Sequence, residues 1–357
     1  MKHEQIDFAF VADLPTLVPA PKKRAARAKA QPIAAPLAQT NESLAATTPA
    51  APASEMEALA RTLEAHGDYR IMRRLQPRLS WPHAATGSAG GAVCRVVVLD
   101  TETTGLDHSK DKIIELALLR VDIDLATGLP VGAVQVYDEL EDPGVPIPRE
   151  IQDITGIDNA MVQGKRLDEA KVIALLDGVD LVIAHNAGFD RPFCEARLPA
   201  FSQLAWACSF ADIPWREQGK RSSKLESLAQ DNGWFYDAHR AEMDCHALLA
   251  VLAAPLPKLP HTGLAHLVEQ AKKPSYRLMA TNAPFDAKDK LKARNYRWNA
   301  EQKVWSTRVG DSKALEAEFA WLKENAYHQR SVVVQFERLE AGVRYSSRPG
   351  EMLYHQL

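Results

Sequence analysis

The chain has 357 residues and a formal net charge of −3, with a pI near 6.4. The length predicts two or three folded units, and the charge excludes a uniformly basic protein that coats nucleic acid. The four cysteines show no CxxC spacing, which excludes a disulfide framework and a structural zinc site and is typical of a reduced, intracellular protein. Without a signal-peptide pattern or a bilayer-length apolar run, we expect a cytoplasmic location and no membrane contact.

The first part of the chain divides into two segments. Residues 1–53 are rich in Ala and Pro and bury too little apolar surface to fold, so we expect a disordered arm. Residues 54–88 predict a short helical element, because Met56, Leu59 and Leu63 recur at helical spacing and Ile71 to Leu75 suggest a second short helix.

Residues 92–257 alternate between strand and helix patterns. The predicted strands are residues 95–99, 113–122, 132–140 and 181–184, and the predicted helices are 149–154, 158–162, 167–176, 192–197, 224–232 and 241–252. Early strands followed by helices and a further strand indicate an α/β domain with a mixed sheet flanked by helices.

Pro255, Pro257 and Pro260 predict a linker to a small α+β accessory domain over residues 271–346. Its pattern is β-α-β-β-α-β, which is the ferredoxin-like order. The cationic helix and the strand aromatic residues of this domain have two possible roles. They contact nucleic acid together, or the helix is simply solvated while the aromatic residues fill the core. Residues 347–357 are expected to be a frayed tail.

The most informative residues are two acids that follow the apolar run 96–99. Asp100 and Glu102 are two positions apart, so their side chains project from the same face of a strand. Open α/β sheets bind their ligands at the carboxyl ends of strands. Two adjacent carboxylates repel each other unless a cation lies between them, so the pattern predicts a divalent cation site.

Two later segments supply further candidates. Asp190 follows the strand at residues 181–184, where Pro192 is placed to begin a helix. His239 precedes a predicted apolar helix, and Asp244 lies within that helix. A spacing of five does not align two side chains on one helical face, so His239 is expected on the preceding loop or in the first turn.

Segments 100–106 (DTETTGL), 185–190 (HNAGFD) and 239–244 (HRAEMD) resemble the three motifs of the DEDDh (DnaQ-like) exonucleases, the family of the proofreading (epsilon) subunit of bacterial DNA polymerase III. Residues 154–157 (ITGI) and 224–229 (KLESLA) resemble two further stretches of that family. The resemblance covers residues 92 to about 252 and implies a ribonuclease H-like fold.

The resemblance implies a metal-dependent 3′→5′ exonuclease that releases nucleoside 5′-monophosphates from DNA in proofreading, repair or end processing. Two Mg²⁺ or Mn²⁺ ions would be held by Asp100, Glu102, Asp190 and Asp244, with His239 as general base. The implied substrate contacts, on single-stranded or frayed 3′ ends, are Thr103, Leu106, Asn186 and Phe189.

Several alternatives remain open. His185 competes with His239 as the base, although a histidine at a buried strand end is more often structural. Arg240 and Glu242 are interpreted as solvated residues at a helix start. The chain could instead be an exoribonuclease or oligoribonuclease, or a non-catalytic nucleic-acid-binding module.

Partners are predicted only from short signals. Gln5 to Phe10 (QIDFAF) resembles the peptides with which bacterial replication proteins bind the sliding clamp, or matches them by chance. Some ninety residues precede the first motif and a domain follows the last, unlike in the polymerase subunit, so association with a polymerase stays open. Oligomeric state is not predicted.

Overall fold

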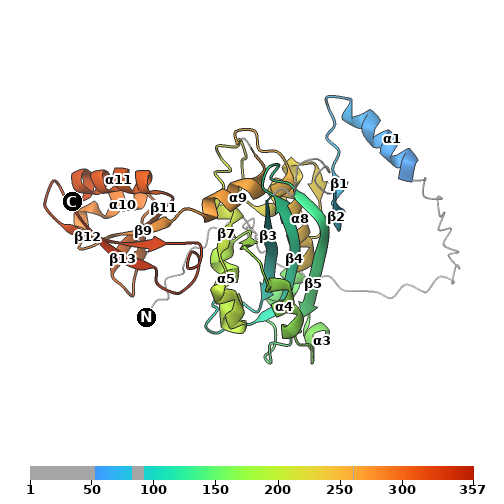
Figure 1. The fold of residues 1–357 in the computed structure, drawn as a ribbon, viewed down its shortest axis with the longest axis horizontal. Helices are drawn as coiled ribbons and strands as arrows, with labels where there is room; N and C mark the ends of the chain where they lie inside the picture. Colours follow the sequence, from blue (N-terminus) through green and yellow to red (C-terminus); the bar gives the residue numbers. More distant parts are fainter. Residues whose placement is uncertain (1–52, 83–91, 260) are drawn as a thin grey trace, which may run out of the picture. The chain divides into compact units, whose positions relative to one another are not determined.

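The computed structural model describes residues 53–82, 92–259 and 261–357 (Figure 1). The predicted disordered arm, with Gln5 to Phe10, lies outside the described residues except for residue 53. No helix within the described ranges is both long and apolar enough to cross a membrane.

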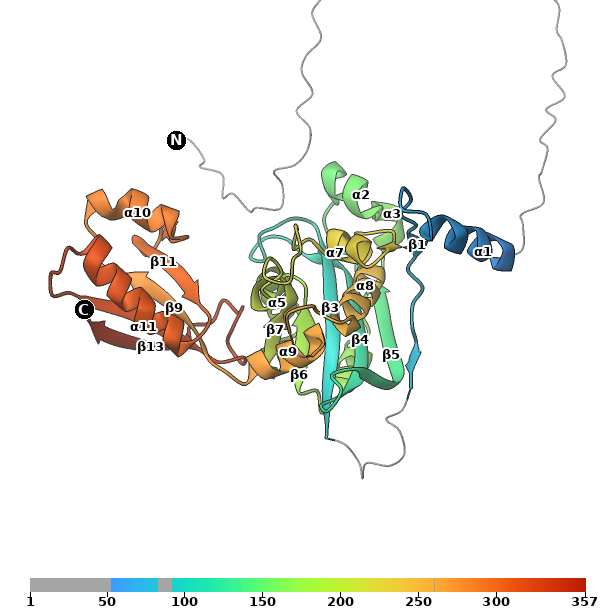
Figure 2. The same ribbon diagram turned by 90° about the horizontal axis from the view of Figure 1, so that it is seen from above.

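A six-stranded mixed sheet forms the centre of the first domain, with strand order β2-β5-β4-β3-β6-β7. The strands are β2 (Ser80–Trp81), β3 (Val93–Thr103), β4 (Ile113–Asp124), β5 (Pro130–Leu140), β6 (Leu181–Ala184) and β7 (Trp206–Cys208). Antiparallel pairing joins β3, β4 and β5, which run side by side in Figure 2, and parallel pairing joins β3, β6 and β7. The predicted mixed sheet is therefore confirmed.

Helices cover both faces of this sheet. The domain contains α2 (Arg149–Thr155), α3 (Asn159–Val162), α4 (Glu169–Leu176), α5 (Ala187–Arg197), η1 (Pro199–Gln203), α6 (Ser209–Asp212), α7 (Leu225–Asp231) and α8 (Ala241–Ala253). Side chains of β3 alternate between two cores: Val96 and Val98 pack with α7 and α8, and Val97 and Leu99 pack with α4 and α5. Because both faces are covered, these four residues are fully buried.

The segment before the sheet differs from the prediction. Helix α1 (Ala53–Glu64) is present, but the predicted second helix is wrong. In its place β1 (Arg73–Arg74) pairs in parallel with β8 (Trp234–Phe235), and β2 pairs with β5. These two-residue strands are too short to show a sequence period, and β1 finds its partner some 160 residues further along. The segment thus extends the first domain.

The predicted boundary after the first domain is also wrong. Helix α9 (Gly263–Ala271) follows the proline-containing stretch and buries Leu264, Leu267 and Val268 in the same core as α8. The Thr262 side chain caps the helix by accepting a hydrogen bond from the Ala265 N–H. Pro255 and its neighbours therefore form a turn within the domain, which extends through Ala271.

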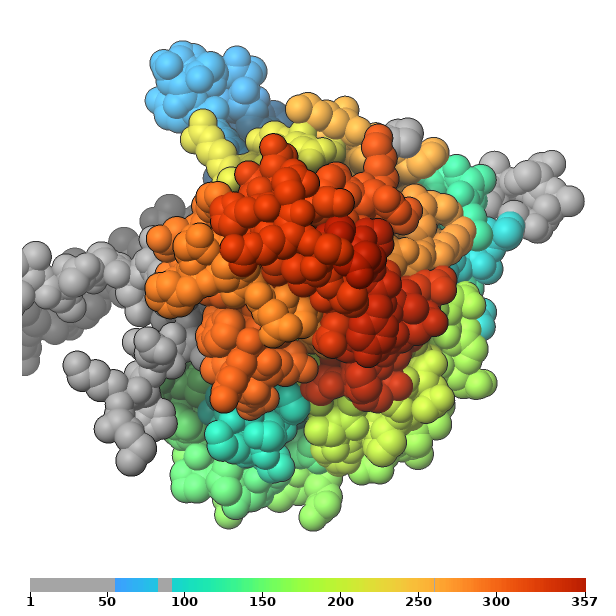
Figure 3. Space-filling view, turned by 90° about the vertical axis from the view of Figure 1, so that its left-hand side faces the viewer, coloured from blue at the N-terminus to red at the C-terminus, as the bar shows by residue number. Residues whose placement is uncertain are grey.

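The C-terminal domain contains a five-stranded antiparallel sheet with strand order β10-β11-β9-β12-β13. Its residues are coloured orange to red in the space-filling view of Figure 3. Its elements are β9 (Ser275–Ala280), η2 (Phe285–Ala287), α10 (Lys288–Ala293), β10 (Arg297–Asn299), β11 (Val304–Val309), α11 (Ser312–Trp321), η3 (Leu322–Ala326), β12 (Val333–Leu339) and β13 (Glu351–Gln356). The predicted tail is wrong, because β13 pairs along the edge of β12 over six residues. A short edge strand at a chain end is hard to distinguish from a frayed terminus.

The loop between β12 and β13 contacts the first domain through Arg191 on α5. The Arg191 side chain is fully buried and donates hydrogen bonds to the carbonyl oxygens of Ala341 (3.0 Å), Gly342 (2.6 Å) and Arg344 (2.7 Å). Tyr345 from the same loop packs into the core beside α5. The two domains are therefore joined by buried polar contacts as well as by the chain.

Candidate active site

Asp100 and Glu102 lie on β3, which continues through both acids instead of ending at residue 99 as predicted. Across the sheet, Asp100 is opposite Ala117 and Glu102 is opposite Glu115 on β4. Since residues two apart on a strand share a face, both carboxylates point to the side covered by α8. The strand register shifts directly after Glu102, and an irregularity of this kind is common beside functional sites.

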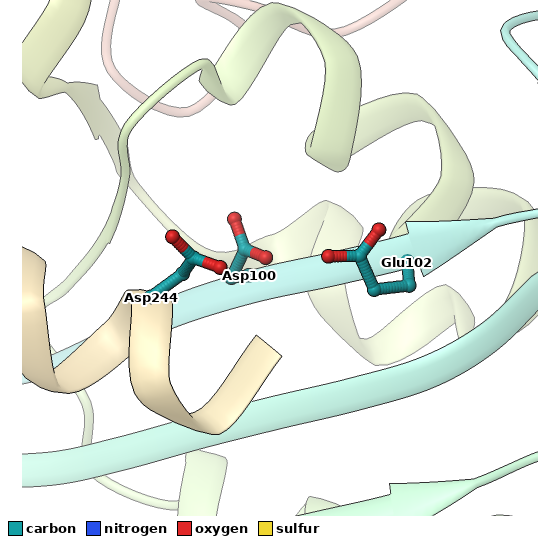
Figure 4. A group of neighbouring side chains, drawn as sticks. All are labelled: Asp100, Glu102 and Asp244. Carbon is teal, nitrogen blue, oxygen red and sulfur yellow. The ribbon is translucent and has the colours of Figure 1, made fainter. Parts of the chain in front are cut away.

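Asp244, in the first turn of α8, completes a group of three acids. One carboxylate oxygen from each of Asp100, Glu102 and Asp244 lies within 4.8 Å of the other two, and Figure 4 shows the three side chains converging. Two donors fix Asp244: the Tyr236 hydroxyl at 2.8 Å and the Arg240 backbone N–H at 3.2 Å. Hard oxygen ligands at this spacing suit a divalent cation such as Mg²⁺ or Mn²⁺.

Asp190 is adjacent but not part of that group of three. It lies in the first turn of α5, is buried, and accepts a hydrogen bond from the Thr101 hydroxyl at 2.8 Å. The helix begins at Ala187, earlier than predicted, so Pro192 lies inside it. Thr101 is the neighbour of Asp100 on β3, so its hydrogen bond places the fourth acid beside the other three. Repulsion from Asp190 is also the largest effect of any charge on the pKa of Asp100.

Burial raises the pKa of all four acids, and repulsion from neighbouring acids raises the pKa of Asp100, Glu102 and Asp190 further. The pKa of Glu102 is raised to about 8, first by burial and then by the charge of Asp244. Burial likewise raises the pKa of Asp190 to about 7 and holds that of Asp100 well above its usual range. Burial also raises the pKa of Asp244, although the Tyr236 hydroxyl opposes the change. Bound cations would supply the positive charge that this cluster lacks.

The two candidate bases occupy different environments. His239 is exposed on the loop before α8, as predicted, with a left-handed backbone (φ 64°), and its charge lowers the pKa of the neighbouring Asp244. His185 is buried, and its two ring nitrogens contact the Ser209 hydroxyl (2.7 Å) and the Ser223 carbonyl oxygen (2.9 Å). Burial lowers the pKa of His185 to about 4. Burial and these two contacts favour the interpretation of His185 as a structural residue.

Glu115 and Arg240 form a support that sequence reasoning missed. Glu115 on β4 is fully buried and accepts hydrogen bonds from the Arg240 guanidinium (2.6 Å) and the Ala241 backbone N–H (2.8 Å). The prediction that Arg240 is merely solvated is wrong. These bonds fix the start of α8, and so the backbone that carries Asp244, to the strand beside Glu102. The available signal was a lone acid inside the apolar segment 113–119.

The four predicted substrate contacts lie at or just after the C-terminal end of β3, which carries the acids, and at the start of α5. Thr103 is buried, and its hydroxyl donates to the Gly105 carbonyl oxygen at 2.6 Å. Leu106 is 61% exposed, as a residue that contacts a bound base must be. Asn186 precedes α5, and the ring of Phe189 packs at 5.0 Å from that of Phe193.

Comparison with known proteins shows which family the first domain resembles. Residues 97–252 match the RNase_T family model, described as Exonuclease. Residues 97–252 are thus similar to an exonuclease family, in agreement with the predicted resemblance.

Individual relatives specify the similarity further. The chain is 30% identical over 182 residues to DNA polymerase III PolC-type of Thermotoga maritima, covering 49% of this chain but 13% of that protein. It is 28% identical to DNA polymerase III subunit epsilon of Treponema pallidum, covering 49% of this chain and 82% of that protein. A structure titled Exonuclease X in complex with 5′ overhanging duplex DNA is 29% identical and covers 44% of this chain and 89% of that one, with a TM-score of 0.35.

Proposed function

We propose that the protein is a metal-dependent 3′→5′ exonuclease that releases nucleoside 5′-monophosphates from the 3′ ends of DNA, in proofreading, repair or end processing. The observation that carries the proposal is the convergence of three carboxylates, with oxygens within 4.8 Å of one another, beside an exposed histidine. The raised pKa values of these acids fit a site built to receive cations. The match of residues 97–252 to an exonuclease family model supports the same chemistry.

Each acid has a role in this proposal. Asp100, Glu102 and Asp244 would hold two divalent cations together with Asp190, which stands beside Asp100. The cations would supply a lowered pKa for the attacking water and charge neutralisation at the departing 3′ oxygen. The Tyr236 hydroxyl donates to one oxygen of Asp244 and the Arg240 backbone N–H donates to the other, so both oxygens of this acid are oriented.

His239 is proposed as the general base that takes the proton of the attacking water. Its position on an exposed loop, one residue before Arg240, allows the imidazole to approach and leave. The left-handed backbone at His239 is uncommon for a residue with a side chain. Such a conformation persists only where neighbours fix it, and here the bonds of Arg240 to Glu115 and Asp244 do so.

The substrate would be held by residues at the end of β3 and the start of α5. Thr103 and its backbone would meet the terminal 3′-hydroxyl, and the exposed Leu106 would pack against the last bases. Asn186 and Phe189 would shape the nucleotide pocket. The same acids would serve RNA equally well, so an exoribonuclease or oligoribonuclease is the competing outcome of the test.

The test is digestion of matched single-stranded DNA, duplex DNA with a mispaired 3′ end, and RNA, each labelled at the 5′ end. The proposal expects a ladder that shortens from the 3′ end with Mg²⁺, and no digestion with EDTA or with Asp100→Asn or His239→Gln. The control Asp153→Asn changes an exposed acid on α2 and should digest at the normal rate. Activity that persists with both EDTA and Asp100→Asn overturns the mechanism, and binding without digestion identifies a non-catalytic module.

The proposal extends to partners and location. Binding of a sliding clamp by Gln5 to Phe10 rests on sequence alone, and unchanged clamp affinity after deletion of residues 1–11 would dispose of it. Co-purification with polymerase subunits tests polymerase association. A cytoplasmic location is tested by cell fractionation.

A further inference from the structure

Positive charge is concentrated in the C-terminal part of the chain. Residues 272–357 contain 16 Lys and Arg against 10 Asp and Glu, a net charge of +6 in a chain whose total is −3. The excess is greatest in residues 272–310, with ten basic and three acidic residues. These residues form β9, α10, β10 and β11. A basic region in an otherwise acidic chain indicates a polyanionic partner.

Two tryptophans lie together at the end of β9, and Phe285 lies in η2, the element that follows β9 along the chain. On paired strands, Trp298 is opposite Trp305, with ring centroids 5.6 Å apart, and Trp305 is opposite Ala280 at the end of β9. Phe285 follows five residues after Ala280. We call Phe285, Trp298 and Trp305 the aromatic end of the domain.

The aromatic end is not the core of this domain. Phe285 is 88% exposed and Trp298 is 50% exposed, and only Trp305 packs partly against the core. The core contains other aromatic residues, among them the buried Tyr296 and Phe319. Large exposed aromatic residues that the fold does not need are typical of a binding surface.

Cations stand beside these rings without acidic partners. The Lys288 ammonium lies 5.9 Å from the centre of the Phe285 ring, and Lys303 lies in the turn between β10 and β11, next to the tryptophan pair. Arg277 and Arg294 pair with Glu337 and Glu318. Neither Lys288 nor Lys303 forms an ion pair within the described ranges of the chain, so both are available to phosphates.

We propose that the aromatic end, with Lys288 and Lys303, binds single-stranded nucleic acid at a site separate from the acids of the first domain. Unstacked bases expose both faces, and aromatic rings stack on them whatever the sequence, while lysines neutralise adjacent phosphates. Duplex DNA presents no free base faces, so the surface selects single strands. This binding does not depend on the proposed exonuclease activity. The further idea that the surface holds the strand whose 3′ end is being digested rests on the proposed function.

The test measures binding of the full chain to a fluorescent oligothymidine in EDTA, where hydrolysis plays no part. The double variant Phe285→Ala/Trp298→Ala should weaken binding about 25-fold or more, since each stacked base contributes a factor of about five or more. The double variant Lys288→Gln/Lys303→Gln should reduce the slope of log affinity against log salt by about 1.4, because each neutralised phosphate contributes about 0.7 on a single strand.

Matched controls come from other surfaces of the same domain. Tyr354 is 65% exposed on the opposite edge strand β13, and Lys313 lies on α11, so Tyr354→Ala and Lys313→Gln should leave affinity and salt slope unchanged. Unfolding midpoints of all variants establish that the domain stays folded. The proposal is overturned if Phe285→Ala/Trp298→Ala binds normally, if Tyr354→Ala loses as much affinity, or if duplex competes as well as single strands.

A second measurement separates this site from the first. Digestion of a labelled trinucleotide, too short to occupy both surfaces, should proceed at the same rate in Phe285→Ala/Trp298→Ala and in the unchanged protein, while digestion of a long single strand at limiting concentration slows. Equal slowing of both substrates overturns the separate site. Failure of the protein to digest anything counts against the proposed function and leaves the binding result to stand.

Discussion

Removal of divalent metal should make the protein less stable as the pH rises. Glu102 and Asp190 have folded-state pKa values raised to about 8 and about 7, from ordinary values of 4.5 and 3.8. Between the ordinary and the raised values, the folded protein binds more protons than the unfolded chain. Stability contributed in this way is present at low pH and is lost as the pH rises toward 8.

The size of the effect follows from the shifts. One carboxyl that is protonated when folded and ionised when unfolded changes the free energy of unfolding by about 1.4 kcal/mol per pH unit. From pH 5 to pH 7, one such group lowers the free energy of unfolding by roughly 3 kcal/mol. Because four acids are clustered, the total loss of stability can exceed this value. Mg²⁺ at a hundred times its dissociation constant restores about 2.7 kcal/mol.

The assay is urea denaturation from pH 5 to pH 8, in EDTA and in Mg²⁺. Burial also raises the pKa of Asp138 to about 7, although Asp138 is outside the three-acid group. Asp138 therefore affects stability in EDTA and in Mg²⁺ alike, and the difference in unfolding free energy between the two series isolates the effect of the metal site. Glu102→Gln should reduce the EDTA slope by up to about 1.4 kcal/mol per pH unit, and Asp153→Asn should not. A stability in EDTA that is flat or increases from pH 5 to pH 8 would refute the reasoning.

Three further predictions concern residues around the site. Tyr236→Phe should weaken Mn²⁺ binding about tenfold in calorimetric titration, because the hydroxyl orients a ligand; unchanged affinity would contradict this. Arg191→Met should lower the free energy of unfolding, measured in urea, by about 3–5 kcal/mol, because Arg191 is buried. The control Lys171→Met removes an exposed cation and should cost less than about 1 kcal/mol. Equal losses would contradict a stabilising role for the buried Arg191 contacts. His185→Gln should cost about 1–3 kcal/mol of stability but keep the pH profile of digestion, whereas a folded, inactive variant would make His185 catalytic.

The elements with local signals could be predicted from the sequence. Strands β3, β4 and β6 are long or fully apolar, and α8 carries an apolar helical pattern, so their positions were predicted within a few residues. The two-residue strands β1 and β2, the edge strand β13 and the packing of α9 depend on partners far away in the chain. Such pairing gives a short segment its structure without leaving a pattern in its own residues.

The start of α5 shows a local signal that pointed to the wrong residue. Pro192 favoured a helix beginning there, but the Asn186 carbonyl oxygen accepts the Phe189 N–H at 2.7 Å and begins the helix at Ala187. Proline inside a helix leaves the carbonyl four residues earlier without its usual donor. The early start places Asp190 on the first turn of the helix, where it meets Thr101 on β3.

The acids themselves were predictable, and the residues that hold them were not. Asp100, Glu102 and Asp244 stand out because a strand end and a helix start are local patterns. Glu115, Tyr236 and the Arg240 contact matter only because β4 pairs with β3 and α8 packs across both. Without the Arg240 guanidinium, the fully buried carboxylate of Glu115 would have no cationic partner, directly opposite Glu102. The negative charge at this end of the sheet is therefore balanced only when Arg240 pairs with Glu115 and cations bind the acids.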